Sequence, residues 1–408
     1  MRTCIFIFVS LLFQFNFAQS VNDIYDSGVD KLKSNQPEEA IKSFSYVIDK
    51  DKTYYEAYHD RGIAYTRLNK YDLAIEDFTT AIKIKKDYFS AYSNRALALL
   101  KTGKEKEALA DFDKIITMKP EYVDAYEKRG DLYLEMKNTD AAIKDFSKVI
   151  ELKPEKQNVY SRRAALYIQS KNYDAAIKDI NFLISKNPNN SKAIYLRGQC
   201  YYEQKLYVKA CIDLTKALND LKDKEEEITG YLANAYFEDK KYNDAIKHYT
   251  SLYTKFKSKN KHVFLNYGIA LFKVNKFIEA TKQLSKAIQY DKKNEIQFEA
   301  YYNRAQAYLS IKKDQQAIQD LNKSILIKPD YAEAYMYRGL LHYDKKRFLQ
   351  AVDDMSNVIK IKESADAYYY RGAIYYNMKK NKSACSDLQK AAEMGHQKAK
   401  SEMAKICL

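Results

Sequence analysis

Apolar and small residues recur at helical spacing along this chain, in short runs separated by polar breaks. The stretch 123–156, VDAYEKRGDLYLEMKNTDAAIKDFSKVIELKPEK, shows the pattern most completely. Its first half places such residues every three or four positions, and its second half resumes that period after a polar break at 137–140. Pro154 lies where the second run must stop, because proline cannot continue a helix. The unit is therefore predicted to be two antiparallel helices joined by a short turn.

Copies of this 34-residue unit fill the chain. A single hairpin cannot bury its own apolar face, so neighbouring copies are expected to stack. Eleven copies are found, which start near Val21, Tyr55, Phe89, Val123, Gln157, Ser191, Glu226, Lys261, Phe298, Ala332 and Ala365.

The eighth position of every copy is glycine or alanine. Its occupants are Gly28, Gly62, Ala96, Gly130, Ala164, Gly198, Ala233, Gly268, Ala305, Gly339 and Gly372. Glycine inside a helix costs about 1 kcal/mol relative to alanine, so its recurrence needs a reason. Close approach of two helix backbones, which a larger side chain would hold apart, is the expected one.

Over residues 21–398 the chain resembles the tetratricopeptide repeat family. Tyrosine takes an early aromatic position (as Tyr58 and Tyr126 do) and a later one (as Tyr65 and Tyr133 do), alanine opens the second helix, and a closing proline survives as Pro120, Pro154, Pro188 and Pro329. The resemblance implies an all-α, right-handed superhelical solenoid of about eleven helix-turn-helix repeats, with a concave groove lined mainly by first helices. It also implies that the protein holds other proteins and catalyses nothing.

The chain divides into five predicted parts. Residues 1–18, with Arg2 before an apolar run and Ala18 at its end, are predicted to be a secretory signal peptide, and an uncleaved membrane anchor is the alternative. Repeats 1–6 span 21–224, repeats 7–8 span 225–297, repeats 9–11 span 298–398, and a capping helix is expected over 396–408. Repeats 7–8 contain extra residues and lack the closing proline, so they form either a softer joint or ordinary repeat drift.

An arginine at the seventh position and an aspartate at the twenty-third occur together in eight copies. The pairs are Arg61 with Asp77, Arg95 with Asp111, Arg129 with Asp145, Arg163 with Asp179, Arg197 with Asp213, Arg304 with Asp320, Arg338 with Asp354, and Arg371 with Asp387. The other three copies lack both members. This joint presence and absence indicates contact. A ladder of ligand-binding arginines is one interpretation, and a structural ion pair that locks the hairpin is favoured.

Four cysteines follow the predicted signal peptide. Cys200 could meet Cys211 across one hairpin, and Cys385 could meet Cys407, since an exported protein can hold disulfides. The alternative is that they are small buried apolar residues. The five histidines lack metal-ligand spacing, and no nucleophile, phosphate-binding or paired-carboxylate motif occurs. No metal, cofactor or enzymatic activity is expected.

The formal net charge of +15 comes mostly from dispersed lysines. Attraction to an anionic surface is possible, but a solvated lysine-rich face is favoured, and no nucleic-acid partner is expected.

Candidate ligand contacts come from the second, fifth, ninth and twelfth positions of the repeats, which should face the groove. These positions turn aromatic and apolar from about Ser191 onward. The candidates are Tyr195, Tyr202, Asn234, Phe237, Leu265, Phe272, Tyr302, Met336, Tyr343, Tyr369 and Tyr376. Rigid rings suit peptide binding, although some of these residues could instead pack between repeats. The sequence thus predicts an exported, periplasmic or extracellular scaffold that is soluble after signal cleavage and binds a protein or peptide of unknown identity. The alternative is a cell-envelope component that self-associates or binds an anionic surface or glycan through its lysines.

Overall fold

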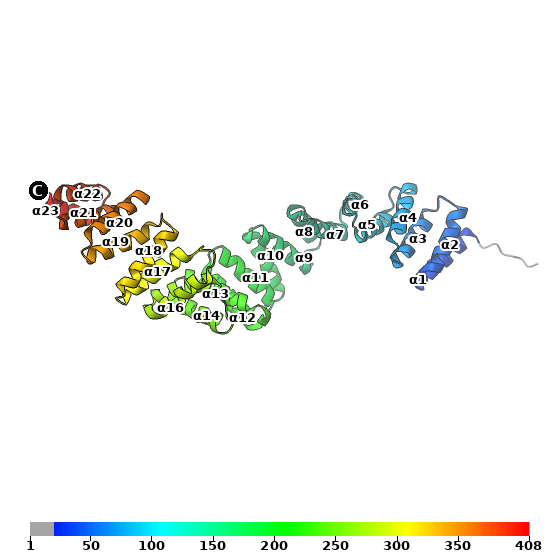
Figure 1. Ribbon diagram of the computed structural model, residues 1–408. Helices are drawn as coiled ribbons and strands as arrows, with labels where there is room; N and C mark the ends of the chain where they lie inside the picture. The colour runs from blue at the N-terminus through cyan, green and yellow to red at the C-terminus, as the bar shows by residue number, and fades with distance from the viewer. Residues whose placement is uncertain (1–19, 408) are drawn as a thin grey trace, which may run out of the picture. The chain divides into compact units, whose positions relative to one another are not determined.

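The computed structural model describes residues 20–407, and the predicted signal peptide lies outside them. The described residues form twenty-three α-helices and one short 3-10 turn, without a β-strand. The predicted all-α fold of repeated hairpins is confirmed, and the helices run in pairs in chain order (Figure 1).

The first helix of each repeat begins at the predicted residue or one residue before it. These helices are α1 Val21–Lys33, α3 Tyr55–Arg67, α5 Phe89–Lys101, α7 Val123–Glu135, α9 Gln157–Gln169, α11 Ser191–Glu203, α13 Glu225–Glu238, α15 Lys261–Lys273, α17 Gln297–Ser310, α19 Ala332–Asp344 and α21 Ala365–Asn377.

The second helices complete the hairpins, and one further helix follows them. They are α2 Pro37–Lys50, α4 Tyr71–Ile84, α6 Glu105–Met118, α8 Thr139–Leu152, α10 Tyr173–Lys186, α12 Tyr207–Asp220, α14 Tyr242–Thr254, α16 Phe277–Tyr290, α18 Asp314–Ile327, α20 Phe348–Ile361 and α22 Asn381–Glu393, with α23 Gln397–Ile406 at the end. The 3-10 turn η1 is Lys222–Lys224. Helix α23 packs on α22, as expected of a capping helix.

The chain separates into two compact units, residues 1–183 and 184–408. Within each unit, the second helix of a hairpin packs on the first helix of the next. The boundary falls inside α10 and not in the irregular repeats 7–8. Those two repeats share apolar clusters with both neighbours: Leu232 packs with Leu214, and Ala307 packs with Leu271. A softer joint at 225–297 stays a prediction.

The eighth position is small because a side chain of the second helix packs against it. This corrects the expectation that two helix backbones approach each other there. A Cβ atom added to Gly62 would lie 2.6 Å from the ring of Phe78, and one added to Gly268 would lie 2.5 Å from Leu284. The partner is in each case the residue at the twenty-fourth position of the same repeat, and it belongs to the second helix. The close approach is therefore between one helix and a large side chain of the other, more than between two backbones.

Each of the eight arginines forms a two-pronged ion pair with its aspartate. In the second repeat, Arg61 Nε and a terminal guanidinium nitrogen both donate to the carboxylate of Asp77, each at 2.8 Å. The other seven pairs have the same geometry. Burial raises the pKa of Asp77 although Arg61 opposes the shift, so removing the arginine would leave a costly buried charge.

The arginines also join neighbouring hairpins, which the sequence analysis missed. The third guanidinium nitrogen donates to the residue at the twenty-fifth position of the preceding repeat. Arg95 reaches Thr79 at 3.0 Å, and Arg338 reaches Asn322 at 2.7 Å. The acceptors for the other arginines whose bond is described are Ser45, Asp113, Ser147, Ser285 and Ser356. The sequence could have predicted this contact, because the twenty-fifth positions named here all hold short polar residues.

The eighth repeat keeps this junction with other residues. Tyr267 replaces the arginine, and its hydroxyl lies 2.8 Å from Thr250 Oγ1, the twenty-fifth position of the preceding repeat. Gln283 replaces the aspartate, and its buried Oε1 accepts no hydrogen bond among the described residues. The hydrogen bond between hairpins is thus retained where the ion pair is lost.

Arg338→Tyr should lower the free energy of unfolding by about 3 kcal/mol, because the carboxylate of Asp354 would stay buried without its partner. Adding Asp354→Gln, which gives the pair found in the eighth repeat, should restore at least half of that loss. Chemical denaturation of both variants measures the effect. Equal or additive losses in the single and double variants would show that the two side chains are not coupled.

Candidate binding surface

First helices of neighbouring hairpins contact each other within each unit, as α3 does with α5 and α13 does with α15. Side chains at positions 2, 5, 9 and 12 were predicted to line the face that these helices share. We call it the first-helix face. The candidate residues all come from it, and the structure assigns them different roles.

Tyr195 and Leu265 were predicted to contact a ligand, and the structure corrects this. Tyr195 is 3% exposed and packs in a cluster with Leu214, while Leu265 is 4% exposed and packs with Ile296. The hydroxyl of Tyr195 accepts a hydrogen bond from Gln199 at 2.6 Å. Both side chains stabilise the junction to the next hairpin.

Two further candidates are held by neighbouring side chains. The carbonyl oxygen of Asn234 accepts a hydrogen bond from the buried hydroxyl of Tyr249 at 2.8 Å. Tyr369 stacks on His396 with ring centres 4.2 Å apart and donates to Glu402 of α23 at 3.1 Å. Asn234 therefore serves its own hairpin, and Tyr369 docks the last helix.

Partly exposed aromatic side chains follow the twelfth position through the second unit. Most lie against an aromatic residue that opens the second helix: Tyr202 against Tyr207, Phe237 against Tyr242, Phe272 against Phe277, and Tyr343 against Phe348, with ring centres 5.4 to 6.1 Å apart. Tyr376 has no such partner and is 48% exposed. We call Tyr202, Phe237, Phe272, Tyr343 and Tyr376 the turn aromatic row.

The ring of Tyr202 is neutral and preorganised. Burial raises the pKa of Tyr202 to about 12, so its hydroxyl stays protonated at neutral pH. Edge-to-face partners hold the rings of Tyr202, Phe237 and Phe272 in place without covering them. Such rings offer apolar area to a ligand at little cost in conformational entropy.

In the first unit, the first-helix face of the fourth repeat is ion-paired instead. Glu127 at a fifth position is buried, and it binds Lys156 and lies 3.4 Å from Arg162. The same arginine contacts Asp131 at 2.6 Å. Charges that satisfy one another leave little to attract a ligand. The sequence indicated that this face turns aromatic and apolar from about Ser191 onward. The ion pairs of the fourth repeat agree with that change.

At six junctions, the residue just before a first helix packs on the fifth position of the preceding repeat, a contact the sequence analysis missed. Tyr54 packs on Tyr25, Tyr88 on His59, and Tyr331 on Tyr302, with ring centres 4.9 to 5.1 Å apart. Lys156 on Glu127, Lys224 on Tyr195 and Ile296 on Leu265 are equivalents of different chemistry. We call this the junction contact.

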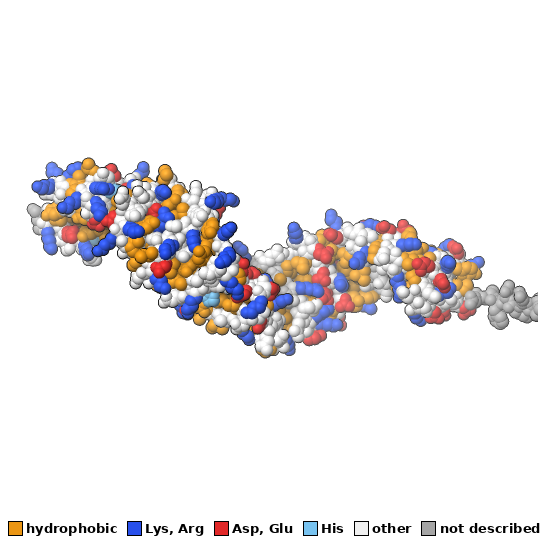
Figure 2. Space-filling model, turned by 60° about the horizontal axis from the view of Figure 1, so that its bottom comes forward, with side chains coloured by type: hydrophobic (Ala, Val, Ile, Leu, Met, Phe, Trp, Pro, Cys, Tyr) orange, Lys and Arg blue, Asp and Glu red, His pale blue; other side chains and the backbone are white. Residues whose placement is uncertain are grey.

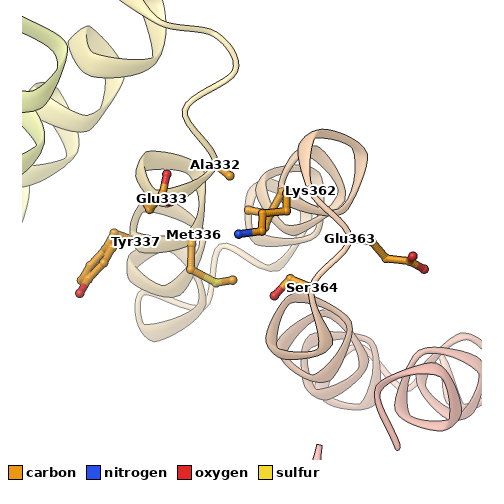
Figure 3. A pocket seen from close by; sticks show the side chains of 8 residues that line it. Ala332, Glu333, Met336, Tyr337, Lys362, Glu363 and Ser364 are labelled. Carbon is orange, nitrogen blue, oxygen red and sulfur yellow. The ribbon is translucent and has the colours of Figure 1, made fainter. Parts of the chain in front are cut away.

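Two hollows open on the first-helix face where the junction contact is weak. One, of about 170 Å³, lies beside Ser93, Leu97 and Tyr122 in the first unit. The other, of about 240 Å³, lies beside Met336, Val358 and Ser364 in the tenth repeat. Figure 3 shows Met336 and Lys362 directed toward the same space, while Tyr337 and Glu363 point away from it.

Cysteines on two hairpins behave differently. Cys385 and Cys407 form a disulfide, with Cα atoms 5.6 Å apart, which ties α22 to the end of α23. Cys200 and Cys211 are free and buried, so the bridge considered for them is not formed. Position ten packs toward the preceding hairpin, as Leu132 does, whereas Cys211 faces Tyr236 of the following one. Burial raises the pKa of both thiols to about 11, which leaves them unreactive.

Within residues 20–407, no group of three or more histidine, cysteine or acidic side chains is placed to bind a metal ion. No described helix is both long enough and apolar enough to cross a membrane. Among the histidines, His342 is partly buried, and burial lowers its pKa below the ordinary value.

The fold and the first-helix face define a repeat protein built from stacked helical hairpins. Family models agree: a tetratricopeptide repeat model matches residues 89–122, 123–156 and 298–331, and others match 62–103 and 366–393. A model described as anaphase-promoting complex, cyclosome, subunit 3 matches 169–252. The chain belongs to the tetratricopeptide repeat family.

Curated relatives are similar over a few repeats. DnaJ homolog subfamily C member 3 of Gallus gallus is 35% identical over 100 residues, which are 24% of this chain and 19% of that protein. Sperm-associated antigen 1 of Homo sapiens is 33% identical over 103 residues, which are 25% of this chain and 11% of that protein. The chain thus spans about a fifth or less of the length of these relatives.

One solved structure resembles the chain over most of its length. The structure of Naa15/Naa10 bound to HypK-THB matches with a TM-score of 0.51 at 10% sequence identity. The matched region covers 90% of this chain and 68% of the chain in that structure. This likeness supports the fold alone.

Titration of the denatured, non-reduced protein, produced with its N-terminal segment in an exporting host, should find two free thiols per chain. They would be Cys200 and Cys211, because the other pair is bridged and Cys4 would leave with the signal peptide. Four thiols would exclude the bridge, and three would indicate that Cys4 is retained. Reduction should also lower the stability of the last repeat, by about 3 kcal/mol for a loop of this size.

Proposed function

We propose that this protein is an exported, non-enzymatic scaffold whose first-helix face in residues 184–408 binds an apolar or aromatic peptide segment of a partner protein. The turn aromatic row carries the proposal. Its rings are partly exposed, and those of Tyr202, Phe237 and Phe272 are held by edge-to-face contacts. By contrast, the first-helix face of the fourth repeat, within residues 20–183, is closed by ion pairs. Aromatic anchors of this kind dominate the free energy of protein recognition.

Export is supported by two observations. The N-terminal segment has the composition of a signal peptide, and the Cys385–Cys407 disulfide suits an oxidising compartment. The periplasm or the extracellular space is therefore the proposed location.

The alternative is an envelope component that adheres through its lysines. Figure 2 shows Lys and Arg side chains scattered over the face in view among acidic and apolar ones, without a single basic patch. This distribution favours the peptide-binding proposal over adhesion to an anionic surface or glycan.

Peptides selected from a displayed library against the full chain should bind less tightly to Tyr343→Ala and Tyr376→Ala, by about tenfold each, as expected for loss of an aromatic anchor. Fluorescence anisotropy measures the affinity. Ile212→Ala and Leu349→Ala are matched controls, since these side chains lie on second helices and are 65% and 66% exposed.

Salt separates the two proposals. Binding to the aromatic face should change less than about threefold between 50 and 300 mM salt, because apolar contacts are not screened. Affinity that collapses over this range, with the tyrosine and control variants alike, would contradict peptide binding at the aromatic face and favour the lysine-based alternative.

A further inference from the structure

The tenth repeat lacks the aromatic side chains that close the same site in other repeats. In the ninth repeat, Tyr331 packs its ring against Phe298 and Tyr302, with ring centres 5.2 and 5.1 Å apart. The equivalent residues of the tenth repeat are Ser364, Ala332 and Met336. Two rings are thus replaced by a hydroxymethyl and a methyl group, and a hollow of about 240 Å³ remains at this place.

The same aromatic closure recurs elsewhere in the chain. In the second repeat, the ring of Tyr88 lies 5.0 Å from that of Tyr55. In the third, the ring of Tyr122 lies 4.8 Å from that of Phe89, but the fifth position is Ser93 and the smaller hollow remains beside it. The chain itself therefore shows what this site accommodates when it is filled. The occupant is a phenol ring that enters from the junction between two hairpins.

A lysine covers the rings in each closed site. The ammonium group of Lys328 lies 4.6 Å from the ring centre of Phe298, Lys85 lies 4.4 Å from Tyr55, and Lys119 lies 4.0 Å from Phe89. Each is a cation–π contact. These lysines occupy the thirty-first position of their repeats.

Lys362 is the equivalent lysine of the tenth repeat, and the site offers it no ring. It lines the hollow with Met336 and Val358, and its amino end points into the space beside Met336 (Figure 3). Glu363, which is next to it, is drawn away by Lys390 at 3.3 Å. Lys362 therefore occupies the position from which the other lysines cover a ring, and here it faces the hollow.

We propose that this hollow binds a tyrosine or phenylalanine side chain of a partner protein, which completes in trans the closure that Tyr331 provides in the ninth repeat. The inference rests on the proposed function, because it names one contact of the bound segment. The volume is sufficient: an apolar cavity of about 150 Å³ accepts benzene. Met336 would supply the sulfur–aromatic contact that flexible thioethers make readily, and Lys362 would lie over the ring.

The methyl group of Met336 provides a direct test without any peptide. Titration of the full chain, carrying 13C-methyl methionine, with p-cresol should shift the Met336 resonance upfield in a saturable way, because a ring would lie against it. The other methionine resonances should not respond, and 4-methylcyclohexanol, which has no ring current, should not reproduce the shift. A Met336 resonance that is indifferent to p-cresol would overturn the proposal.

Variants test the assignment to this site. Ser364→Tyr should fill the hollow from within the chain, move the Met336 resonance upfield before any ligand is added, and abolish its response. Ala332→Phe closes the site from the opposite wall and should act alike if the first variant folds poorly. Lys362→Met should weaken p-cresol binding about threefold by removing the cation–π contact. Leu349→Tyr, on the exposed face of a second helix, is the control. An unchanged p-cresol response in a folded Ser364→Tyr or Ala332→Phe variant would contradict the assignment.

Comparison with peptide binding separates this inference from the proposed function. Selected peptides that bind while Met336 ignores p-cresol would refute the hollow and leave the proposed function standing. A Met336 response to p-cresol without any peptide binding would refute the proposed function and leave the aromatic site in the hollow standing. A Met336 resonance that shifts with protein concentration alone would mean that a second copy of the chain fills the hollow, and would overturn the proposal of a separate partner.

Discussion

The stack depends on one steric match that recurs in the seven hairpins with a glycine at the eighth position. This glycine faces a large side chain at the twenty-fourth position, as Gly130 faces Phe146 and Gly198 faces Leu214. Because the large side chain fills the space that a Cβ branch would need, the two helices close tightly and bury their apolar surface. Everything else in the structure acts on hairpins that are already closed in this way.

Two further contacts turn closed hairpins into a stack. The arginine at position seven holds an aspartate of its own hairpin and a short polar residue of the preceding one, so a single guanidinium joins three helices. The junction contact then fills the gap between consecutive first helices. Its chemistry varies freely, from the tyrosine pair of Tyr54 and Tyr25 to the ion pair of Lys156 and Glu127. The stack therefore accepts side chains of different chemistry in this gap. Where the filler is missing, in the tenth repeat, the surface gains a site.

The sequence predicted the helices well and the surface less well. Helix starts follow from local periodicity and from the repeat, so they were located within one residue. The Arg–Asp contacts followed from their joint occurrence. Exposure could not be read in the same way, because the position in the repeat does not decide it. Tyr195 is 3% exposed, whereas Tyr25 and Tyr302, at the same fifth position, stay partly exposed although the next loop packs a ring on each. The same limit applied to the cysteines: Cys200 and Cys211 lie on facing helices, yet their side chains point to different neighbours. Which way a side chain points from its helix, and which residue the next loop places beside it, decide whether it is exposed and what it contacts.

The most direct test of the steric match is the stability of Gly62→Val beside that of Gly230→Val, both measured by chemical denaturation. A side chain at position 62 would overlap the buried ring of Phe78, whereas one at Gly230 would meet nothing within 4 Å. The account predicts that Gly62→Val loses about 2–3 kcal/mol through overpacking, and that Gly230→Val is as stable as the parent or slightly more so. Equal stability of the two variants would contradict it.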